Sequence, residues 1–284
     1  MTLEQKSRAH SFLAMHQAPP LLVLLNAWDA ASARVFEKAG ARAIATTSAG
    51  IAFALGYRDG QVVSRKEMLE AVTRITAVVH LPVTADLEGG YGPRAEDVAE
   101  TTRQLLRTGA VGFNLEDAKS DASDPLFEVP EQVERIRAAR ETAEHAGVHL
   151  VINARTDVFL GEVGEPSKRL GETVRRLNAY REAGADCLFA PGVTDAATIK
   201  ELVRQVSGPL NLLVGVGLPG VTGLERLGVA RISVGSGIMR AALGSAREAA
   251  TEILQKGTYA TFVERGIPFR EINELMAGGR PRVA

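Results

Sequence analysis

Acidic side chains and one arginine follow short apolar segments at three places in the chain. Asp86 ends one such segment with Glu88 two positions further on, Glu116 ends the next, and Arg155 follows the one after that. If the segments are parallel strands in a barrel, their carboxyl ends meet on one rim, where residues distant in sequence converge. We therefore expect these four side chains to form one polar site.

The three acids have the chemistry of a divalent metal site. Asp86 and Glu88, at positions i and i+2, project to the same side of an extended chain. With Glu116 from the neighbouring strand they supply hard carboxylate oxygens, which suit Mg²⁺ or Mn²⁺. The alternative is that each acid caps a helix or pairs with Arg155. Three acids at adjacent strand ends favour the metal, which retains waters and need not bind all three directly.

Arg155 predicts an anionic substrate. Its planar guanidinium matches a carboxylate or phosphonate with two parallel hydrogen bonds. The alternative is that Arg155 only neutralises Glu116 or Asp117, which end the preceding strand.

Small residues follow another apolar segment. Ser48, Ala49 and Gly50 come directly after Thr47, and their backbone N–H groups could hold an oxyanion. The alternative is an ordinary turn from a strand into a loop.

The cysteine and the histidines are predicted to have structural roles. Cys187, the sole cysteine, lies at the start of an apolar segment, which favours a buried thiol over a nucleophile. The histidines fall in helical segments or at turns on the opposite edge, where we expect surface or capping roles. They are His10, His16, His80, His145 and His149.

Eight short, nearly all apolar segments are spaced along the chain, as expected for parallel strands buried on both faces. They are 21–25, 43–47, 82–86, 111–116, 149–154, 186–190, 210–214 and 231–234. Amphipathic helical segments separate them, at 30–39, 66–79, 95–108, 130–145, 168–183, 196–206 and 223–227, with a last one at about 238–255. Gly40, Gly109, Gly147 and Gly184 stand where helices are expected to end.

Eight strand–helix units in series predict a closed α/β barrel, a (β/α)8 TIM barrel. An open doubly wound sheet is the alternative, since alternation alone does not establish closure. Segment 2–15 is expected to form a helix that covers the bottom of the barrel, and 259–276 to form one or two helices beyond it. We expect one domain over residues 1–284, with a helical extension from about residue 257.

The whole-chain charge argues against nucleic acid and membrane partners. The 33 basic and 34 acidic residues give a net charge of −1, without the basic excess that either partner attracts. Residues 1–17 lack the apolar core of a signal peptide, and no segment has the roughly 20 apolar residues needed to span a bilayer. A cytoplasmic protein is expected.

Seven short motifs, in order from about Asn26 to Gly244, resemble the isocitrate lyase/phosphoenolpyruvate mutase superfamily. They are Asn26–Ala30, Thr46–Gly50, Gly56–Gly60, Asp86–Gly92, Asn114–Asp117, Asn153–Asp157 and Ser233–Ser236. The resemblance implies a (β/α)8 barrel whose last helix is exchanged between subunits, in a homodimer or homotetramer.

The same resemblance implies a metal-dependent enzyme. Mg²⁺ or Mn²⁺ would be held by Asp86, Glu88 and Glu116, partly through water, with Asp59 nearby. Asp59 and Arg155 are the expected catalytic residues. The substrates would be small α-keto or α-hydroxy carboxylates, and the reactions make or break C–C or P–C bonds.

The resemblance also implies how the substrate is bound. Ser48, Ala49 and Gly50 would meet its oxygens through their backbone, with Arg155 as the counter-ion. Asn211 matches a polar position of the seventh strand.

The chain departs from the family pattern in the segment after the fourth strand. Isocitrate and methylisocitrate lyases have a Lys-Cys-Gly-His loop there, but residues 118–127 contain neither cysteine nor histidine. The Lys-x-Asn-Ser loop of the phosphonopyruvate mutases is also missing. Ala190-Pro191-Gly192 stands where the lyases place a glutamate. The chain thus resembles a phosphonomutase-like branch that lacks the lyase loop.

These features give a leading hypothesis and two alternatives. The first is a metal-dependent lyase or decarboxylase that cleaves a C–C bond through an enolpyruvate-like intermediate, with Lys119, Ser120 or Asp121 on a mobile lid. The second is a phosphonopyruvate mutase or hydrolase, in which Arg58 or Lys119 would supply the phosphoryl pocket. The third is a non-catalytic barrel that binds a metabolite.

Overall fold

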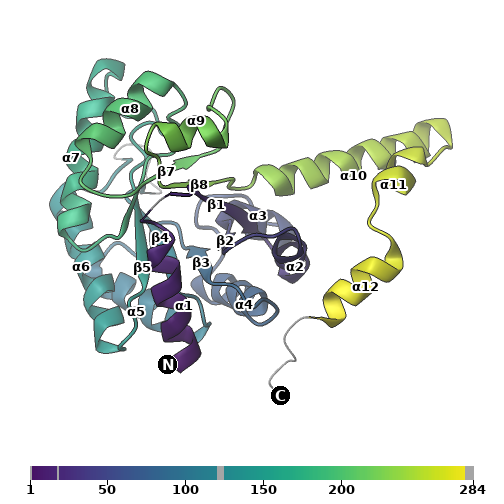
Figure 1. The fold of residues 1–284 in the computed structure, drawn as a ribbon, viewed down its shortest axis with the longest axis horizontal. Helices are drawn as coiled ribbons and strands as arrows, with labels where there is room; N and C mark the ends of the chain where they lie inside the picture. Colours follow the sequence, from purple (N-terminus) through teal and green to yellow (C-terminus); the bar gives the residue numbers. More distant parts are fainter. Residues whose placement is uncertain (1, 18, 120–124, 279–284) are drawn as a thin grey trace.

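A closed barrel of eight parallel strands, β1 to β8 in chain order, forms the centre of the protein (Figure 1). The structure is a computed structural model and describes residues 2–17, 19–119 and 125–278. The strands are β1 (Leu22–Ala27), β2 (Ile44–Thr46), β3 (Val83–Asp86), β4 (Gly112–Glu116), β5 (Val151–Arg155), β6 (Cys187–Phe189), β7 (Leu210–Leu213) and β8 (Arg231–Ser233). Pairing of β1 with β8 closes the ring, so the predicted barrel is confirmed and the open sheet is excluded.

Helices surround the barrel and follow the predicted segments closely. Those that succeed the strands are α2 (Ala30–Lys38), α3 (Ser48–Ala54), α4 (Arg65–Thr76), α5 (Ala95–Arg107), α6 (Val129–His145), α7 (Pro166–Glu182), α8 (Ala196–Gln205), α9 (Val221–Arg226) and α10 (Gly237–Lys256). The four glycines expected to end helices have φ between 68° and 107°, a backbone conformation that glycine adopts without strain. The short helix α3 was not predicted.

Helix α1 (Leu3–Ala14) covers the amino-terminal end of the barrel, as expected. The amide of Gln5 donates to the carbonyl of Leu106 in α5 and to that of Ala110, just before β4. Phe12 packs beneath Gly112, where an added Cβ would come within 2.9 Å of the Phe12 ring. Glycine is therefore required at this position for α1 to seal the barrel.

His16 corrects one prediction, because it is buried and not at the surface. It follows α1, and its side chain is 2% exposed. Its Nδ1 lies 2.8 Å from the carbonyl oxygen of Phe12, and its Nε2 lies 3.4 Å from a guanidinium nitrogen of Arg231. An uncharged ring that donates through Nδ1 and accepts through Nε2 satisfies both contacts. The amphipathic pattern of α1 could not reveal this, since Arg231 is more than 200 residues away.

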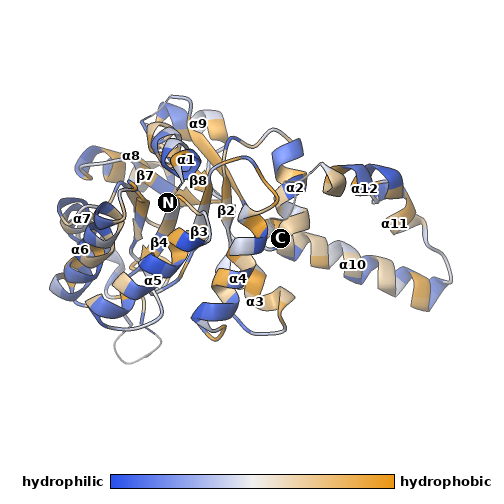
Figure 2. Ribbon diagram, turned by 90° about the horizontal axis from the view of Figure 1, so that it is seen from below, coloured by the Kyte–Doolittle hydropathy of each residue, from blue (hydrophilic) through white to orange (hydrophobic). Residues whose placement is uncertain are grey.

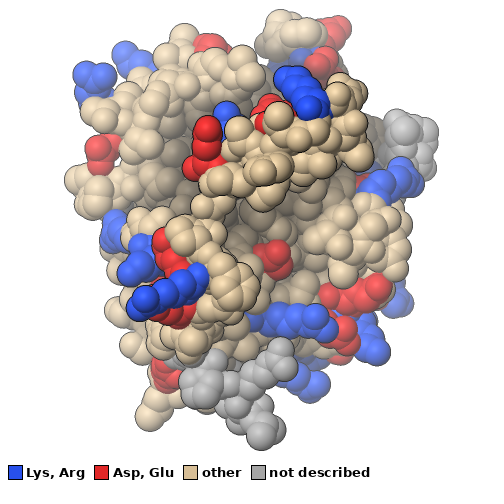
Figure 3. Space-filling model, turned by 90° about the vertical axis from the view of Figure 1, so that its right-hand side faces the viewer, with Lys and Arg blue, Asp and Glu red and all other residues tan. Residues whose placement is uncertain are grey.

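The last three helices leave the barrel as an arm. In Figure 1, α10, α11 (Ala260–Arg265) and α12 (Phe269–Ala277) extend to one side. The end of α12 returns to α2, where the guanidinium of Arg34 donates to the carbonyl of Leu275 at 2.9 and 3.1 Å. Within α10, Met239 alone is buried. Figure 2 shows apolar stretches along the arm, and the face in Figure 3 carries its charges mostly near the edges. Large exposed apolar residues of the arm are Leu243, Ile253, Leu254, Tyr259, Phe262, Val263, Ile267, Phe269 and Met276.

Two further sequence-based expectations can be compared with the structure. The thiol of Cys187 is fully buried in β6, as predicted. In the described part of the chain, no helix is both long and apolar enough to cross a membrane.

His16 should make stability depend on pH. Burial, followed by the positive charge of Arg231, lowers the pKa of His16 to about 4, from 6.5 for a free histidine. Between pH 6.5 and about 4, His16 is therefore protonated in the unfolded chain but not in the folded protein. Its contribution to the free energy of unfolding is present in full above pH 6.5 and is lost as the pH falls towards 4. The loss should reach about 3 kcal/mol.

Urea unfolding of wild type, His16→Gln and His10→Gln between pH 4 and 7 measures this contribution. His10 is an exposed residue of the preceding helix, α1, and serves as the control. The wild type and His10→Gln should lose more stability on acidification than His16→Gln. Parallel pH profiles for all three would show that His16 does not titrate as described.

Candidate active site

The predicted acids gather at the carboxyl ends of the central strands. Asp86 is the last residue of β3 and Glu116 the last of β4, and Glu88 lies in the loop after β3. Asp59 comes from an exposed loop between α3 and α4. A cavity of about 250 Å³ opens between these elements. It is lined by Arg58, Asp59, Gly60, Gln61, Glu88, Gly89, Glu116, Ala118 and Lys119.

Asp86 is oriented by hydrogen bonds to β2, to the start of α3 and to β4. Its Oδ2 accepts from the hydroxyl (2.8 Å) and the backbone N–H (3.1 Å) of Ser48, and its Oδ1 accepts from the amide of Asn114 at 3.3 Å. Its own backbone N–H donates to the hydroxyl of Thr46 at 2.9 Å. The carboxylate, 9% exposed as a residue, is therefore fixed at the floor of the site.

Glu88 sits in an unusual backbone conformation, with φ at 51°. Its carboxylate accepts from the backbone N–H of Gln61 at 2.5 Å and lies 3.5 Å from the hydroxyl of Tyr91. Burial, followed by the negative charge of Asp86, raises the pKa of Glu88 to about 7. Such a shift marks a group whose charge is not yet balanced by the protein.

Glu116 shares Arg155 with Asp157. One guanidinium nitrogen of Arg155 lies 2.7 Å from Glu116, and two others donate to the carboxylate of Asp157. Burial raises the pKa of Glu116, with Arg155 opposing and the neighbouring acids adding to the shift. Burial alone would lower the pKa of Arg155, but Glu116 and Asp157 outweigh it and raise that pKa. Arg155 thus pairs with Asp157 and not with Asp117, and its role as substrate counter-ion remains a prediction.

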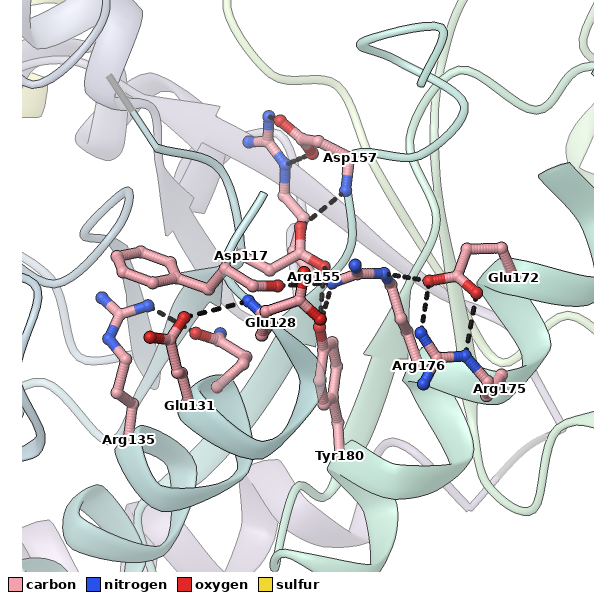
Figure 4. A network of polar contacts seen from close by, with 12 residues as sticks. Asp117, Glu128, Glu131, Arg135, Arg155, Asp157, Glu172, Arg175, Arg176 and Tyr180 are labelled. Carbon is pink, nitrogen blue, oxygen red and sulfur yellow. Dashed lines mark hydrogen bonds and ion pairs between the residues drawn. The ribbon is translucent and has the colours of Figure 1, made fainter. Parts of the chain in front are cut away.

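Asp117 anchors this arrangement from behind (Figure 4). It is fully buried, and its Oδ1 accepts from the backbone N–H of Asp157 at 3.0 Å. Its Oδ2 accepts from the hydroxyl of Tyr180 at 2.7 Å and from Arg176 at 3.2 Å. Arg176 also donates to the carbonyl of Phe127 at 2.7 Å. Asp117 therefore ties the end of β5 to α7 and to the end of the 118–127 segment.

Ser48, Ala49 and Gly50 form the first turn of α3, not a loop. The N–H of Ser48 is bonded to Asp86, and that of Gly50 to the hydroxyl of Thr47 at 3.2 Å. Of the three amides proposed for an oxyanion, only that of Ala49 has no acceptor within the described residues. The fold thus already uses two of these N–H groups, and the binding of a substrate oxygen by all three stays a prediction.

Two other predicted elements lie away from the cavity or outside the described chain. Asn211 is fully buried in β7, donates to the hydroxyl of Ser233 at 3.4 Å, and does not line the cavity. Of the expected lid residues, Ser120 and Asp121 lie outside the described residues, whereas Lys119 lines the cavity.

The oxygen ligands of the site suit a hard divalent cation, but the side chains are not all placed to coordinate it directly. Asp86, Glu88 and Glu116 offer oxygen ligands, and the raised pKa values of Glu88 and Glu116 show that added positive charge would be favourable. Within the described residues, however, no three histidine, cysteine, aspartate or glutamate side chains are spaced to ligate one ion directly. Mg²⁺ tolerates this, because it keeps several of its waters.

Gln61 and Asn114 are site residues for which the sequence suggested no role. Gln61, at φ 58°, donates from its backbone to Glu88 and accepts from the N–H of Tyr91 at 3.2 Å. The carbonyl of Asn114 accepts from Asn153 at 2.7 Å, so its amide must face Asp86. Asn114 lies inside a motif already noted, but no local signal marks Gln61.

Comparisons with known proteins agree with this fold. The phosphoenolpyruvate phosphomutase family model matches residues 12–254. A lyase/mutase candidate from Burkholderia cenocepacia J2315, known from a crystal structure, is 40% identical with a TM-score of 0.91, covering 97% of this chain and 98% of that one. The 2-methylisocitrate lyase of Escherichia coli K12 is 30% identical, covering 74% of this chain and 70% of the lyase. A phosphonopyruvate hydrolase, solved with oxalate and Mg²⁺, is 26% identical with a TM-score of 0.83, covering 95% of each chain.

The chain belongs to the isocitrate lyase/phosphoenolpyruvate mutase superfamily and is an enzyme of that superfamily. The resemblance drawn from its motifs is thereby confirmed.

The hydroxyl of Tyr180 should be important for stability, because it donates to a buried carboxylate. Tyr180→Phe should lower the free energy of unfolding by about 1.5–3 kcal/mol, the usual range for a hydrogen bond to a charged group. Tyr57→Phe is the matched control, because the Tyr57 hydroxyl donates to the exposed Glu67. Its effect should stay within about 0.5 kcal/mol. Equal effects in urea unfolding would contradict the anchoring role of Asp117.

Proposed function

We propose that this enzyme is a Mg²⁺- or Mn²⁺-dependent lyase or decarboxylase that cleaves a C–C bond in a small 2-oxo or 2-hydroxy carboxylate. The observation that carries the proposal is the group of three acids, the buried Asp86 and Glu88 and the partly buried Glu116, set beside Arg155 at the carboxyl end of the barrel. Active sites of (β/α)8 enzymes lie at this end. The Mg²⁺ in the related phosphonopyruvate hydrolase supports the choice of cofactor.

Each residue has a separate task in this proposal. Asp86, Glu88 and Glu116 would hold the metal, some of them through water, and Ser48 and Asn114 keep Asp86 aimed at it. When bound, the ion would supply positive charge to an enolate left by C–C cleavage beside a carbonyl. Arg155, held by Glu116 and Asp157, would face the substrate carboxylate, and Asp59 lies on the cavity wall for proton transfer.

Phosphonopyruvate mutase or hydrolase chemistry is the second candidate, because two further cations line the cavity. Arg58 and Lys119 border the same space as Asp59 and Glu116. A phosphoryl group needs positive charge beyond Arg155, and these two side chains are the sources that the structure offers.

An NMR screen with oxaloacetate, alkylmalates, methylisocitrate and phosphonopyruvate, with and without Mg²⁺, tests the proposal. We expect metal-dependent turnover of a carbon acid that is lost in Asp86→Ala. Glu134→Ala, which removes an exposed carboxylate of α6 that pairs with Arg137, should keep the activity. Turnover of phosphonopyruvate alone would favour the second candidate. No turnover together with no metal binding would refute the assigned site.

We also propose that the arm α10–α12 packs against a second copy of the chain in a homodimer or homotetramer. The exposed apolar side chains of the arm need a partner surface, and patches of this kind mark interfaces. In light scattering after size exclusion, the wild type should run as a dimer or tetramer. The double variant Leu243→Glu/Ile253→Glu should dissociate to monomers, and a monomeric wild type would contradict the proposal.

A further inference from the structure

A buried arginine outside the cavity holds the loop that carries Glu88. Arg135 lies on α6 and is 1% exposed. Its guanidinium donates to the carbonyls of Gly89 and Gly92, the second at 3.2 Å, and to the side chain of Gln132. The flat face of the same guanidinium rests on the ring of Phe127, 3.9 Å from its centre.

The loop that Arg135 grips has a costly backbone. Glu88 and Tyr91 have φ of 51° and 63°, values that side-chain-bearing residues rarely adopt, and Gly90 between them has φ of 81°. For Glu88 and Tyr91, which carry side chains, this conformation is strained and persists only where the surroundings impose it. Gln61 holds this loop conformation from the cavity side, through its hydrogen bonds to Glu88 and Tyr91. Arg135 imposes it from the interior.

Arg135 supplies the side-chain hydrogen bonds to the carbonyls of Gly89 and Gly92, whereas the carbonyl of Gly90 between them accepts from the hydroxyl of Thr101 at 2.8 Å. A Cβ on Gly90 would come within 3.0 Å of Leu115 and Val98, and one on Gly92 within 2.4 Å of Asp97. The loop is thus pressed into the protein, with Gly89 buried and Gly92 partly buried. Without the guanidinium the carbonyl of Gly89 would be a buried polar group with an unmet hydrogen bond, and the loop would shift to reach water.

We propose that Arg135 is a positioning residue for the metal site, which sets the affinity for Mg²⁺ by fixing the backbone from which Glu88 projects. This inference rests on the proposed function, because it requires that Glu88 hold the metal. Lysine cannot replace the arginine: its single ammonium would reach one carbonyl at a time and would not stack on Phe127.

The competing explanation is that Arg135 is a core arginine that serves folding alone. Arg140 provides the matched comparison on the same helix. It is 9% exposed and also holds backbone carbonyls, those of Gly184 at 2.9 and 3.1 Å and of Leu150 at 3.0 Å, together with Asp186. Arg140 has no contact with the loop of Glu88. A purely structural role predicts that the two arginines behave alike.

Calorimetric titration of the metal-free protein with Mg²⁺ and Mn²⁺ separates these explanations, with urea unfolding as the measure of stability. Arg135→Lys should weaken metal binding about tenfold or more, as loss of a supporting contact behind a metal ligand commonly does. Arg140→Lys should lose stability but bind the metal as the wild type does. Phe127→Leu keeps the guanidinium and removes only its stacking partner, so it should fold and weaken binding by a smaller factor.

Each outcome has a definite meaning. A wild type that binds neither metal refutes the proposed function and, with it, the role of Arg135. If the wild type binds the metal and both Arg135→Lys and Arg140→Lys bind it with the same affinity, the role of Arg135 alone is refuted. If Arg135→Lys does not fold, unchanged binding in Phe127→Leu refutes the proposal in its place.

Discussion

The repulsion between carboxylates buried at one end of the barrel is the constraint on which the rest of the site depends. Asp86, Glu88 and Glu116 lie close enough for each to affect the others, and burial removes the water that would screen them. The fold brings them together because parallel strands end on a common rim. The neighbouring hydrogen-bond donors and cations partly compensate the negative charge that collects there.

The compensating groups lie at increasing distance from the three carboxylates. Arg155 touches Glu116 directly and is itself held by Asp157. Asp157 is fixed through its backbone by Asp117, whose charge is met by Tyr180 and Arg176 (Figure 4). Acidic and basic side chains thus alternate from the site into the wall of the barrel, and each charge lies next to one of opposite sign. The compensation around Glu88 remains incomplete, and a divalent cation would complete it.

The sequence was sufficient for the barrel and for the location of the acids. Short apolar segments followed by amphipathic helices reveal both features, because strand burial and helix periodicity are local properties. It was not sufficient for His16, because that residue contacts Arg231, which is more than 200 residues away. It named Glu116 as a possible partner of Arg155, as the structure shows, but offered no reason to expect Asp157 as the second partner. The first turn of α3 was missed for another reason: seven residues carry too few periods to distinguish a helix from a turn. Arg135 gave no local signal, because an arginine on an amphipathic helix is ordinarily solvated.

A crystal structure grown with Mn²⁺ and oxalate, recorded at a wavelength where manganese scatters anomalously, tests the central claim most directly. One anomalous peak is predicted between Asp86, Glu88 and Glu116, with at least one of these carboxylates bound directly and the others within reach of a bridging water. A peak at another place on the protein, or an empty site between these acids at a saturating concentration of Mn²⁺, would contradict the account.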